Sequence, residues 1–167
     1  MNIESNSDDY PIRKPIRANF IDYSCGLYFV TICTRDKKHY FGTIRDGNMY
    51  YSTLGKYCHN TLLQIKEHYP YVEIPHLVVM PNHLHLIIEI SSNICDLDKI
   101  VAKRSRLSVI IGGFKQAVTK FARHEDIEFN WQSRFYDHSI RNQDELNHII
   151  QYIENNVYRW DSDIYYL

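Results

Sequence analysis

The sequence predicts an α+β fold in which one antiparallel sheet carries helices on one face. Three observations lead to this fold class. Short runs rich in β-branched and aromatic residues indicate strands, apolar residues three and four positions apart indicate amphipathic helices, and turn-forming residues separate these elements. Taken in chain order they give the pattern βαββαβ, to which an accessory β-hairpin and a C-terminal helix are added.

The first half of the chain is expected to form a strand, a hairpin and a helix. Residues 27–34 are rich in β-formers and predict a central strand. Residues 40–52 are split by an Asp-Gly dipeptide at 46–47, a strong hairpin signal, which predicts two short strands. Thr53 can cap a helix that runs to about residue 68, just before a proline.

The middle of the chain predicts a strand pair and a second helix. Residues 72–80 and 84–90 are apolar runs separated by a Pro-Asn turn signal, so we expect them to pair antiparallel. Apolar residues then recur at helical spacing from Leu107 to Phe121. The pair Gly112-Gly113 lies inside this stretch and is expected to weaken or kink the helix.

The last part of the chain predicts one more strand and the final helix. Residues 133–139 form the strand candidate. Asn142 can cap the helix, and Glu145 three residues later comes close to a capping box. We expect this helix to run to about Asn156.

The size and composition predict one domain. The chain has 167 residues, of which 44% are hydrophobic and 23% charged. We assign residues 1–17 to a flexible basic arm, residues 18–160 to the domain and residues 161–167 to a short tail. The four cysteines form no close pair and no zinc-like spacing, which favours reduced thiols. Because the chain starts with polar residues and holds no long apolar run, we expect a soluble, cytoplasmic protein without a membrane span.

Positive charge is segregated along the chain, although the net charge is only -1. Between residues 99 and 123 there are seven cations and no acidic residue, whereas a solvated helix face usually mixes both signs. Such segregation is typical of a surface that binds a phosphate backbone. The candidate DNA-binding residues are Arg13, Lys14, Arg17, Lys103, Arg104, Arg106, Lys115, Lys120 and Arg123.

Two histidines lie two positions apart in a predicted strand. Because side chains alternate faces along a strand, His83 and His85 point the same way while Leu84 and Leu86 point into the core. Two imidazoles side by side on a rigid strand make half of a metal site. The spacing alone favours the simpler interpretation, two histidines on the solvated face of a half-buried strand.

The final helix places a tyrosine at the edge of its apolar stripe. Turning by about 100° per residue puts Tyr152 at the margin, with Asn156 one turn later on the same side. Without further information, such a tyrosine is an ordinary amphipathic anchor.

Several blocks in a fixed order together indicate a family. They are YFVTICT at 28–34, VMPNHLH at 79–85, GFKQAVTK at 113–120, WQSRFYDH at 131–138, and IRN at 140–142 followed by QYIENN at 151–156. In these blocks the chain resembles the single-tyrosine HUH transposases of the IS200/IS605-like group, above all the REP-associated tyrosine transposase branch. The resemblance extends from about residue 13 to residue 160.

The resemblance implies a ferredoxin-like fold and metal-dependent cutting and joining of single-stranded DNA. It assigns His83 and His85 as metal ligands, Tyr152 as the nucleophile, and Asn156 as a further ligand where some relatives have glutamine. The metal is expected to be Mg²⁺ or Mn²⁺, and nitrogen ligands make Mn²⁺ the easier of the two to hold. The expected partner is single-stranded DNA with a REP-like hairpin in the bacterial cytosol or nucleoid. The resemblance admits a homodimer as well as a monomer.

The implied reaction proceeds through a covalent intermediate. Tyr152 would attack the scissile phosphorus, form a 5′-phosphotyrosine and free a 3′-hydroxyl, and attack by another 3′-hydroxyl would rejoin strands. His148, one turn before Tyr152, is a candidate base for the phenolic proton. Tyr136 and Tyr158 are alternative nucleophiles.

Other functions fit the sequence less well. A histidine-triad hydrolase needs a third histidine where this chain has Ile87, and an amidohydrolase needs a barrel of roughly 250 residues. The serious alternative is a non-catalytic relative that binds DNA hairpins and no longer cuts.

Overall fold

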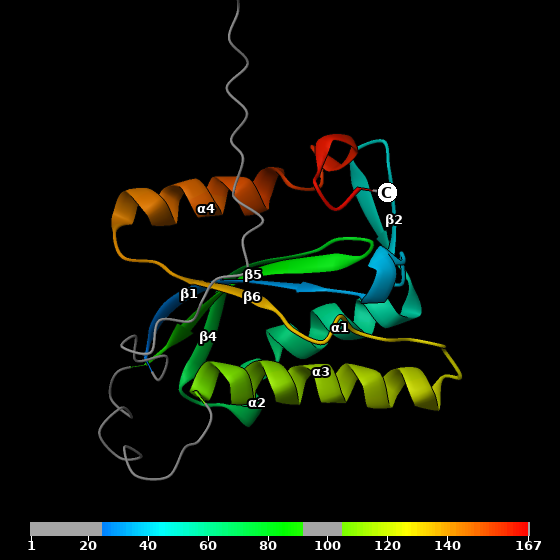
Figure 1. Ribbon diagram of the computed structural model, residues 1–167, viewed down its shortest axis with the longest axis horizontal. Helices are drawn as coiled ribbons and strands as arrows, with labels where there is room; N and C mark the ends of the chain where they lie inside the picture. The colour runs from blue at the N-terminus through cyan, green and yellow to red at the C-terminus, as the bar shows by residue number, and fades with distance from the viewer. Residues whose placement is uncertain (1–24, 92–104, 167) are drawn as a thin grey trace, which may run out of the picture.

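The computed structural model describes residues 25–91 and 105–166, and its centre is a four-stranded antiparallel sheet (Figure 1). The strands are β1 (Gly26–Cys33), β4 (Val72–Val79), β5 (His83–Ile90) and β6 (Tyr136–Ser139), in the spatial order β4-β5-β1-β6. The two central strands are thus first and third in the predicted βαββαβ pattern, which is the ferredoxin-like order. The predicted fold class is confirmed.

Helices cover both faces of this sheet (Figure 1). On one face lie α1 (Thr53–Leu63), the short α2 (Ile65–His68) and α3 (Arg106–His124). On the other face lies α4 (Gln143–Asn155). The larger core fills the space under α1 and α3, where burial of apolar side chains supplies most of the stabilisation. Its fully buried members include Val30, Ile32, Leu54, Leu84, Leu86, Ile88, Ile110, Phe114 and Val118.

Helix α4 closes a second, smaller core. Ile149 and Ile153 project from α4 onto Phe29 of β1 and Ile87 of β5. The predicted cap is confirmed, because the side chain of Asn142 accepts a hydrogen bond from the Glu145 amide at 2.8 Å. This layer fixes α4 against the sheet face that carries the histidines.

Two local predictions for the first helical layer are wrong. The cap of α1 is Ser52 and not Thr53, because the Ser52 hydroxyl accepts from the Gly55 amide at 3.0 Å. Helix α3 runs without interruption through Gly112 and Gly113. A methyl group at Gly113 would overlap the hydroxyl of Tyr69, so this glycine makes room for a neighbouring side chain and does not break the helix.

The accessory hairpin has the predicted form. Strand β2 (Gly42–Arg45) pairs with β3 (Asn48–Tyr51) across a two-residue turn. Asp46 and Gly47 have φ values of 49° and 69°, the left-handed conformation that such turns require.

Some sequence expectations fall on residues outside the described ranges, and one is corrected. Cys33 and Cys58 are free thiols, but Cys25 is disulfide-bonded, so the prediction of reduced thiols is wrong for Cys25. Cys95 lies outside the described residues. Within residues 25–91 and 105–166, no helix combines the length and the apolar character needed to cross a bilayer.

Candidate metal centre

The alternation of β5 places the two histidines on the α4 side of the sheet. His83 and His85 share this face with Ile87, while Leu84 and Leu86 point into the larger core. Both imidazoles are buried, with exposed fractions of 0% and 1%. The predicted shared face is therefore confirmed, and the histidines lie on a covered face instead of a solvated one.

The His83 ring is hydrogen-bonded on one nitrogen only. Its Nδ1 lies 2.8 Å from Oδ1 of Asn82. Because an amide oxygen only accepts, Nδ1 carries the hydrogen and Nε2 presents a lone pair. No hydrogen-bond partner for this buried Nε2 is found among the described residues, and the nearest carboxylate oxygen belongs to Asp163 at 3.9 Å.

The His85 ring lies between a strand and α4. Its Nδ1 is 2.7 Å from the Thr31 hydroxyl, and its Nε2 is 3.1 Å from the hydroxyl of Tyr152. Burial lowers the pKa of His85 to about 3, and burial together with the adjacent His85 lowers the pKa of His83 well below its ordinary value. Both imidazoles are therefore neutral near pH 7, which is the form that binds metal.

A carboxylate that the sequence reasoning missed completes the cluster. One ligand atom each from His83, His85 and Asp163 lie within 4.8 Å of one another. Asp163 follows the short helix η3 (Trp160–Ser162), and its Oδ1 accepts a hydrogen bond from the Tyr165 amide at 2.7 Å. The expected division put this residue in a short tail, and no motif in the sequence marks it as a ligand.

Asn156, which the resemblance assigns as a further ligand, stands at the end of α4. It is the C-cap of α4 and is buried, and its Oδ1 has no hydrogen-bond partner among the described residues. The Asn156 amide affects His83 and Asp163. It raises the pKa of His83 and lowers the pKa of Asp163, so in each case it counteracts the effect of burial. Buried polar atoms are normally paired, so the unpaired Nε2 of His83 and the unpaired Oδ1 of Asn156 are two donor atoms that a cation could satisfy.

The donor set fits a divalent ion. Two imidazole nitrogens and one carboxylate oxygen lie close together, and the buried Asn156 amide acts on His83 and Asp163 of this cluster. Mixed nitrogen and oxygen ligands suit Mn²⁺ better than Mg²⁺, which prefers oxygen and keeps several waters. The cluster could therefore hold the predicted metal.

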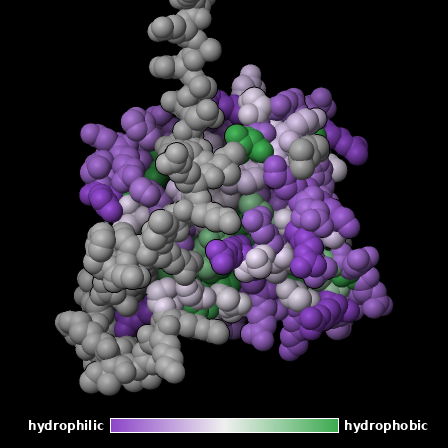
Figure 2. Space-filling view, in the orientation of Figure 1, coloured by the Kyte–Doolittle hydropathy of each residue, from purple (hydrophilic) through white to green (hydrophobic). Residues whose placement is uncertain are grey.

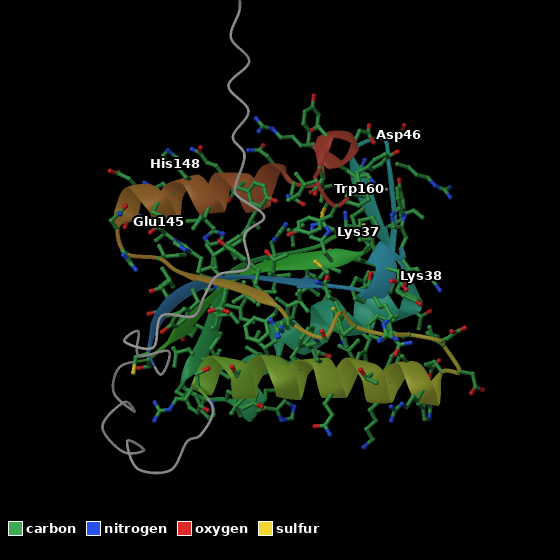
Figure 3. All side chains as sticks on the ribbon, in the orientation of Figure 1. Lys37, Lys38, Asp46, Glu145, His148 and Trp160 are labelled. Carbon is green, nitrogen blue, oxygen red and sulfur yellow. The ribbon has the colours of Figure 1, made fainter. Side chains whose placement is uncertain are left out.

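The end of the chain covers this cluster. The Tyr165 ring lies 4.4 Å from the His83 ring and 5.9 Å from the His85 ring, measured between centroids. Lys37 contacts the same segment. Its Nζ lies 5.8 Å from the centroid of the Tyr165 ring and donates to the Ile164 carbonyl at 3.3 Å. Figure 3 shows Lys37 and Trp160 together beyond the end of α4, next to the start of β5.

The predicted basic residues are not brought to the histidines. Arg13, Lys14, Arg17, Lys103 and Arg104 lie outside the described residues. The other four, Arg106, Lys115, Lys120 and Arg123, belong to α3, on the opposite face of the sheet (Figure 1). The outer surfaces of α3 and α4 are largely hydrophilic (Figure 2). A role of α3 in DNA binding stays a prediction.

The candidate base and the alternative nucleophiles can also be placed. His148 is exposed and projects from the side of α4 that faces away from the sheet (Figure 3). The nitrogen found beside the Tyr152 hydroxyl belongs to His85, and a role of His148 as the base stays a prediction. Tyr158 is 84% exposed, and Tyr136 packs edge-on against Phe29 in the second core.

Comparisons of the sequence with known proteins point to one family. The sequence model of the family described as "Transposase IS200 like" matches residues 27–156. A Haemophilus influenzae protein of uncharacterised function is 35% identical over 168 residues, 93% of each chain. A second protein from that organism carries the provisional name REP-associated tyrosine transposase and is 27% identical over 142 residues, 78% of this chain and 69% of the relative.

A comparison of structures agrees in fold. A structure described as a REP-associated tyrosine transposase bound to a REP hairpin aligns with a TM-score of 0.61. The alignment covers 89% of this chain and 74% of the other, at 21% sequence identity. At this level of identity the likeness establishes the shared fold.

Proposed function

This chain belongs to the IS200-like transposase family, and from that premise we propose that it cuts and rejoins single-stranded DNA with the help of a divalent metal. The observation that carries the proposal is one contact. The Tyr152 hydroxyl lies 3.1 Å from a histidine of a cluster whose ligand atoms could share one ion. A nucleophile and a Lewis-acid site thus lie side by side.

The chain supplies the metal site and the nucleophile from separate segments. His83 and His85 from β5, Asn156 at the end of α4 and Asp163 from the tail would hold the cation. When bound, the cation would polarise a phosphate oxygen as a Lewis acid. The neutral imidazoles and the fixed carboxylate would orient the scissile phosphodiester toward α4.

Tyr152 would carry out the covalent step. Its oxygen forms a bond to the scissile phosphorus as the phenol gives up its proton, and the bond from phosphorus to the 3′-oxygen breaks. That oxygen takes up a proton and leaves as a 3′-hydroxyl, while the DNA 5′-phosphate remains on the tyrosine. Attack by a 3′-hydroxyl reverses these events and joins two strands. Because each step exchanges one phosphate ester for another, no ATP is needed.

The DNA partner is proposed to carry a hairpin. One relative carries the name REP-associated tyrosine transposase, and the structural neighbour is described as bound to a REP hairpin, which supports this partner class. The cations of α3 would hold the DNA backbone away from the cutting centre. Tyr152 and His85 already meet within one chain, so a homodimer is not required to bring them together.

A second candidate function is hairpin recognition without cleavage. It is favoured by the covered state of the site, because both histidines are buried and the Tyr165 ring lies against His83. Under this alternative the DNA would bind at α3 and the cluster would be structural.

One experiment separates the two functions. Labelled single-stranded hairpin DNA from the flanks of the gene is incubated with the protein and Mn²⁺ or Mg²⁺, then run on a denaturing gel. We expect a metal-dependent protein–DNA adduct that disappears in Tyr152→Phe and persists in the matched control Tyr158→Phe. Hairpin binding without an adduct under either metal would favour the recognition module, and an adduct in Tyr152→Phe would exclude Tyr152 as the nucleophile.

A further inference from the structure

Asn82 connects three segments that surround the metal cluster. Its side chain is buried, with an exposed fraction of 1%. Nδ2 donates to the carbonyl of Lys37 at 3.1 Å and to the carbonyl of Tyr165 at 2.8 Å, while Oδ1 faces Nδ1 of His83 at 2.8 Å. One amide side chain therefore contacts the loop after β1, the start of β5 and the C-terminal segment.

These contacts fix which way the Asn82 amide points. Both Lys37 and Tyr165 present carbonyl oxygens, which only accept, so the NH₂ group must face them. The oxygen then faces His83, and Nδ1 of His83 must carry the hydrogen. As a result the Nε2 lone pair of His83 points into the cluster.

Asn82 is also connected to the Asp163 carboxylate, through Tyr165. The carbonyl of Tyr165 is held by Asn82, and the amide of Tyr165 is held by Oδ1 of Asp163 at 2.7 Å. Tyr165 thus transmits the position of Asn82 to Asp163. The other oxygen of this carboxylate, Oδ2, lies 3.9 Å from Nε2 of His83.

We propose that Asn82 is a positioning residue that presents His83 and Asp163 to one divalent cation. The inference rests on the metal site of the proposed function, and it adds the residue that joins the strand to the tail. Partners of this kind fix the orientation of metal-binding histidines, and their loss typically lowers metal affinity about 10- to 100-fold. Asparagine at a turn also has a purely structural use, so the test must separate the two roles.

The first measurement is Mn²⁺ binding by titration calorimetry on the metal-free full chain. We expect Asn82→Ala to weaken Mn²⁺ binding about 10- to 100-fold. The matched control is Ser52→Ala, which removes the cap of α1 and a hydrogen bond to Tyr40 but has no contact with the cluster. This control should lower the melting temperature and leave Mn²⁺ affinity unchanged.

A double-mutant cycle tests the connection from Asn82 through Tyr165 to Asp163. In an Asp163→Asn background, Asn82→Ala should cost less Mn²⁺ affinity than in the wild type, because one of the two groups that Asn82 positions is already lost.

Nitrogen NMR of the imidazoles tests the contact between Asn82 and His83. The wild type should carry the His83 hydrogen on Nδ1, Asn82→Ala should lose this preference, and Asn82→Asp should restore it because an acceptor is present again.

These measurements decide whether Asn82 positions His83 and Asp163 for metal binding. Wild-type Mn²⁺ affinity in a folded Asn82→Ala, or a His83 hydrogen on Nε2 in the wild type, would overturn this inference while leaving the proposed function intact. If the wild type itself bound no Mn²⁺, both would fail. If Asn82→Ala did not fold, Asn82→Asp would take its place. We then expect the His83 hydrogen on Nδ1 and less than additive losses of Mn²⁺ affinity with Asp163→Asn, and strict additivity would overturn the inference.

Discussion

The Tyr152 hydroxyl lies 3.1 Å from Nε2 of His85, the same nitrogen that would face a bound cation. The other nitrogen of this ring is already 2.7 Å from the Thr31 hydroxyl. A cation bound at this nitrogen would use the position that the Tyr152 hydroxyl takes beside it. In the metal-free protein the hydroxyl occupies it, and metal binding must release that hydroxyl.

Removing the hydroxyl should therefore not weaken metal binding. In Tyr152→Phe the ring can still pack on Phe29. Metal binding at Nε2 of His85 then no longer has to break the hydrogen bond to the Tyr152 hydroxyl, which is worth about 1 kcal/mol. We expect Mn²⁺ affinity to rise, by roughly five-fold at most on that value. Titration calorimetry would measure it, with Tyr158→Phe as the control. A ten-fold loss would instead mean that the phenol is itself a ligand.

Replacing the missed carboxylate should move stability and metal binding in opposite directions. Burial raises the pKa of Asp163, so the charged form is disfavoured in the metal-free fold. Asp163→Asn is expected to raise the melting temperature of the metal-free protein and to lower Mn²⁺ affinity by about ten-fold or more. The exposed neighbour provides the control, since Asp161→Asn should change neither. Unchanged Mn²⁺ affinity in Asp163→Asn would remove this residue from the ligand set.

The buried histidines should make the metal-free protein sensitive to acid. The folded pKa of His85 is about 3 and that of His83 is also lowered, whereas an unfolded histidine titrates near 6.5. Below about pH 6.5 the unfolded chain therefore binds protons that the folded chain does not. Stability is fully present above that pH and falls toward pH 3, by about 1.4 kcal/mol per pH unit for His85.

Urea denaturation in the presence of a chelator would measure this slope. His85→Gln should flatten the decline between about pH 6 and pH 4.5, whereas exposed His148→Gln should leave it as in the wild type. Equal slopes in the wild type and His85→Gln would contradict the burial of a neutral imidazole.

The glycine pair in α3 offers a test of packing. Nothing lies within 4 Å of a methyl group added at Gly112, so Gly112→Ala should stabilise the helix by about 0.8–1 kcal/mol. A methyl group at Gly113 would overlap the Tyr69 hydroxyl, and Gly113→Ala should be destabilising by about 1 kcal/mol. Chemical denaturation of the two variants side by side would check the difference. If both were stabilised alike, the contact with Tyr69 would not constrain this position.

The sequence allowed the strands, the helices and the paired histidines to be predicted because each leaves a local signal. Alternating polarity identified the shared face of His83 and His85, and an asparagine followed by a glutamate located the start of α4. These features depend on residues within a few positions of one another. The prediction that Thr53 caps α1 failed by one residue because Ser52 and Thr53 can both cap, and the Ser52 hydroxyl makes the bond.

The missed features depend on contacts between distant segments. Asp163 lies some 80 residues from His83, and no periodic pattern marks it. The face that α4 covers is likewise set by its packing on Phe29 and Ile87, which the spacing of α4 does not encode. For the same reason the basic α3 could not be placed relative to the histidines from its charges alone.

The pairing of β5 with β1 sets Thr31 opposite His85 and Cys33 opposite His83. A slip of one residue would turn both imidazoles into the apolar layer under α1 and α3 and would present Leu84 and Leu86 to Tyr152. Mutations that shift this strand therefore remove the fold and the chemistry together. Tyr152, Asn156 and Asp163 instead come from α4 and the C-terminal segment, so in these parts of the molecule evolution, or an engineer, can adjust the proposed cutting without shifting the strand register.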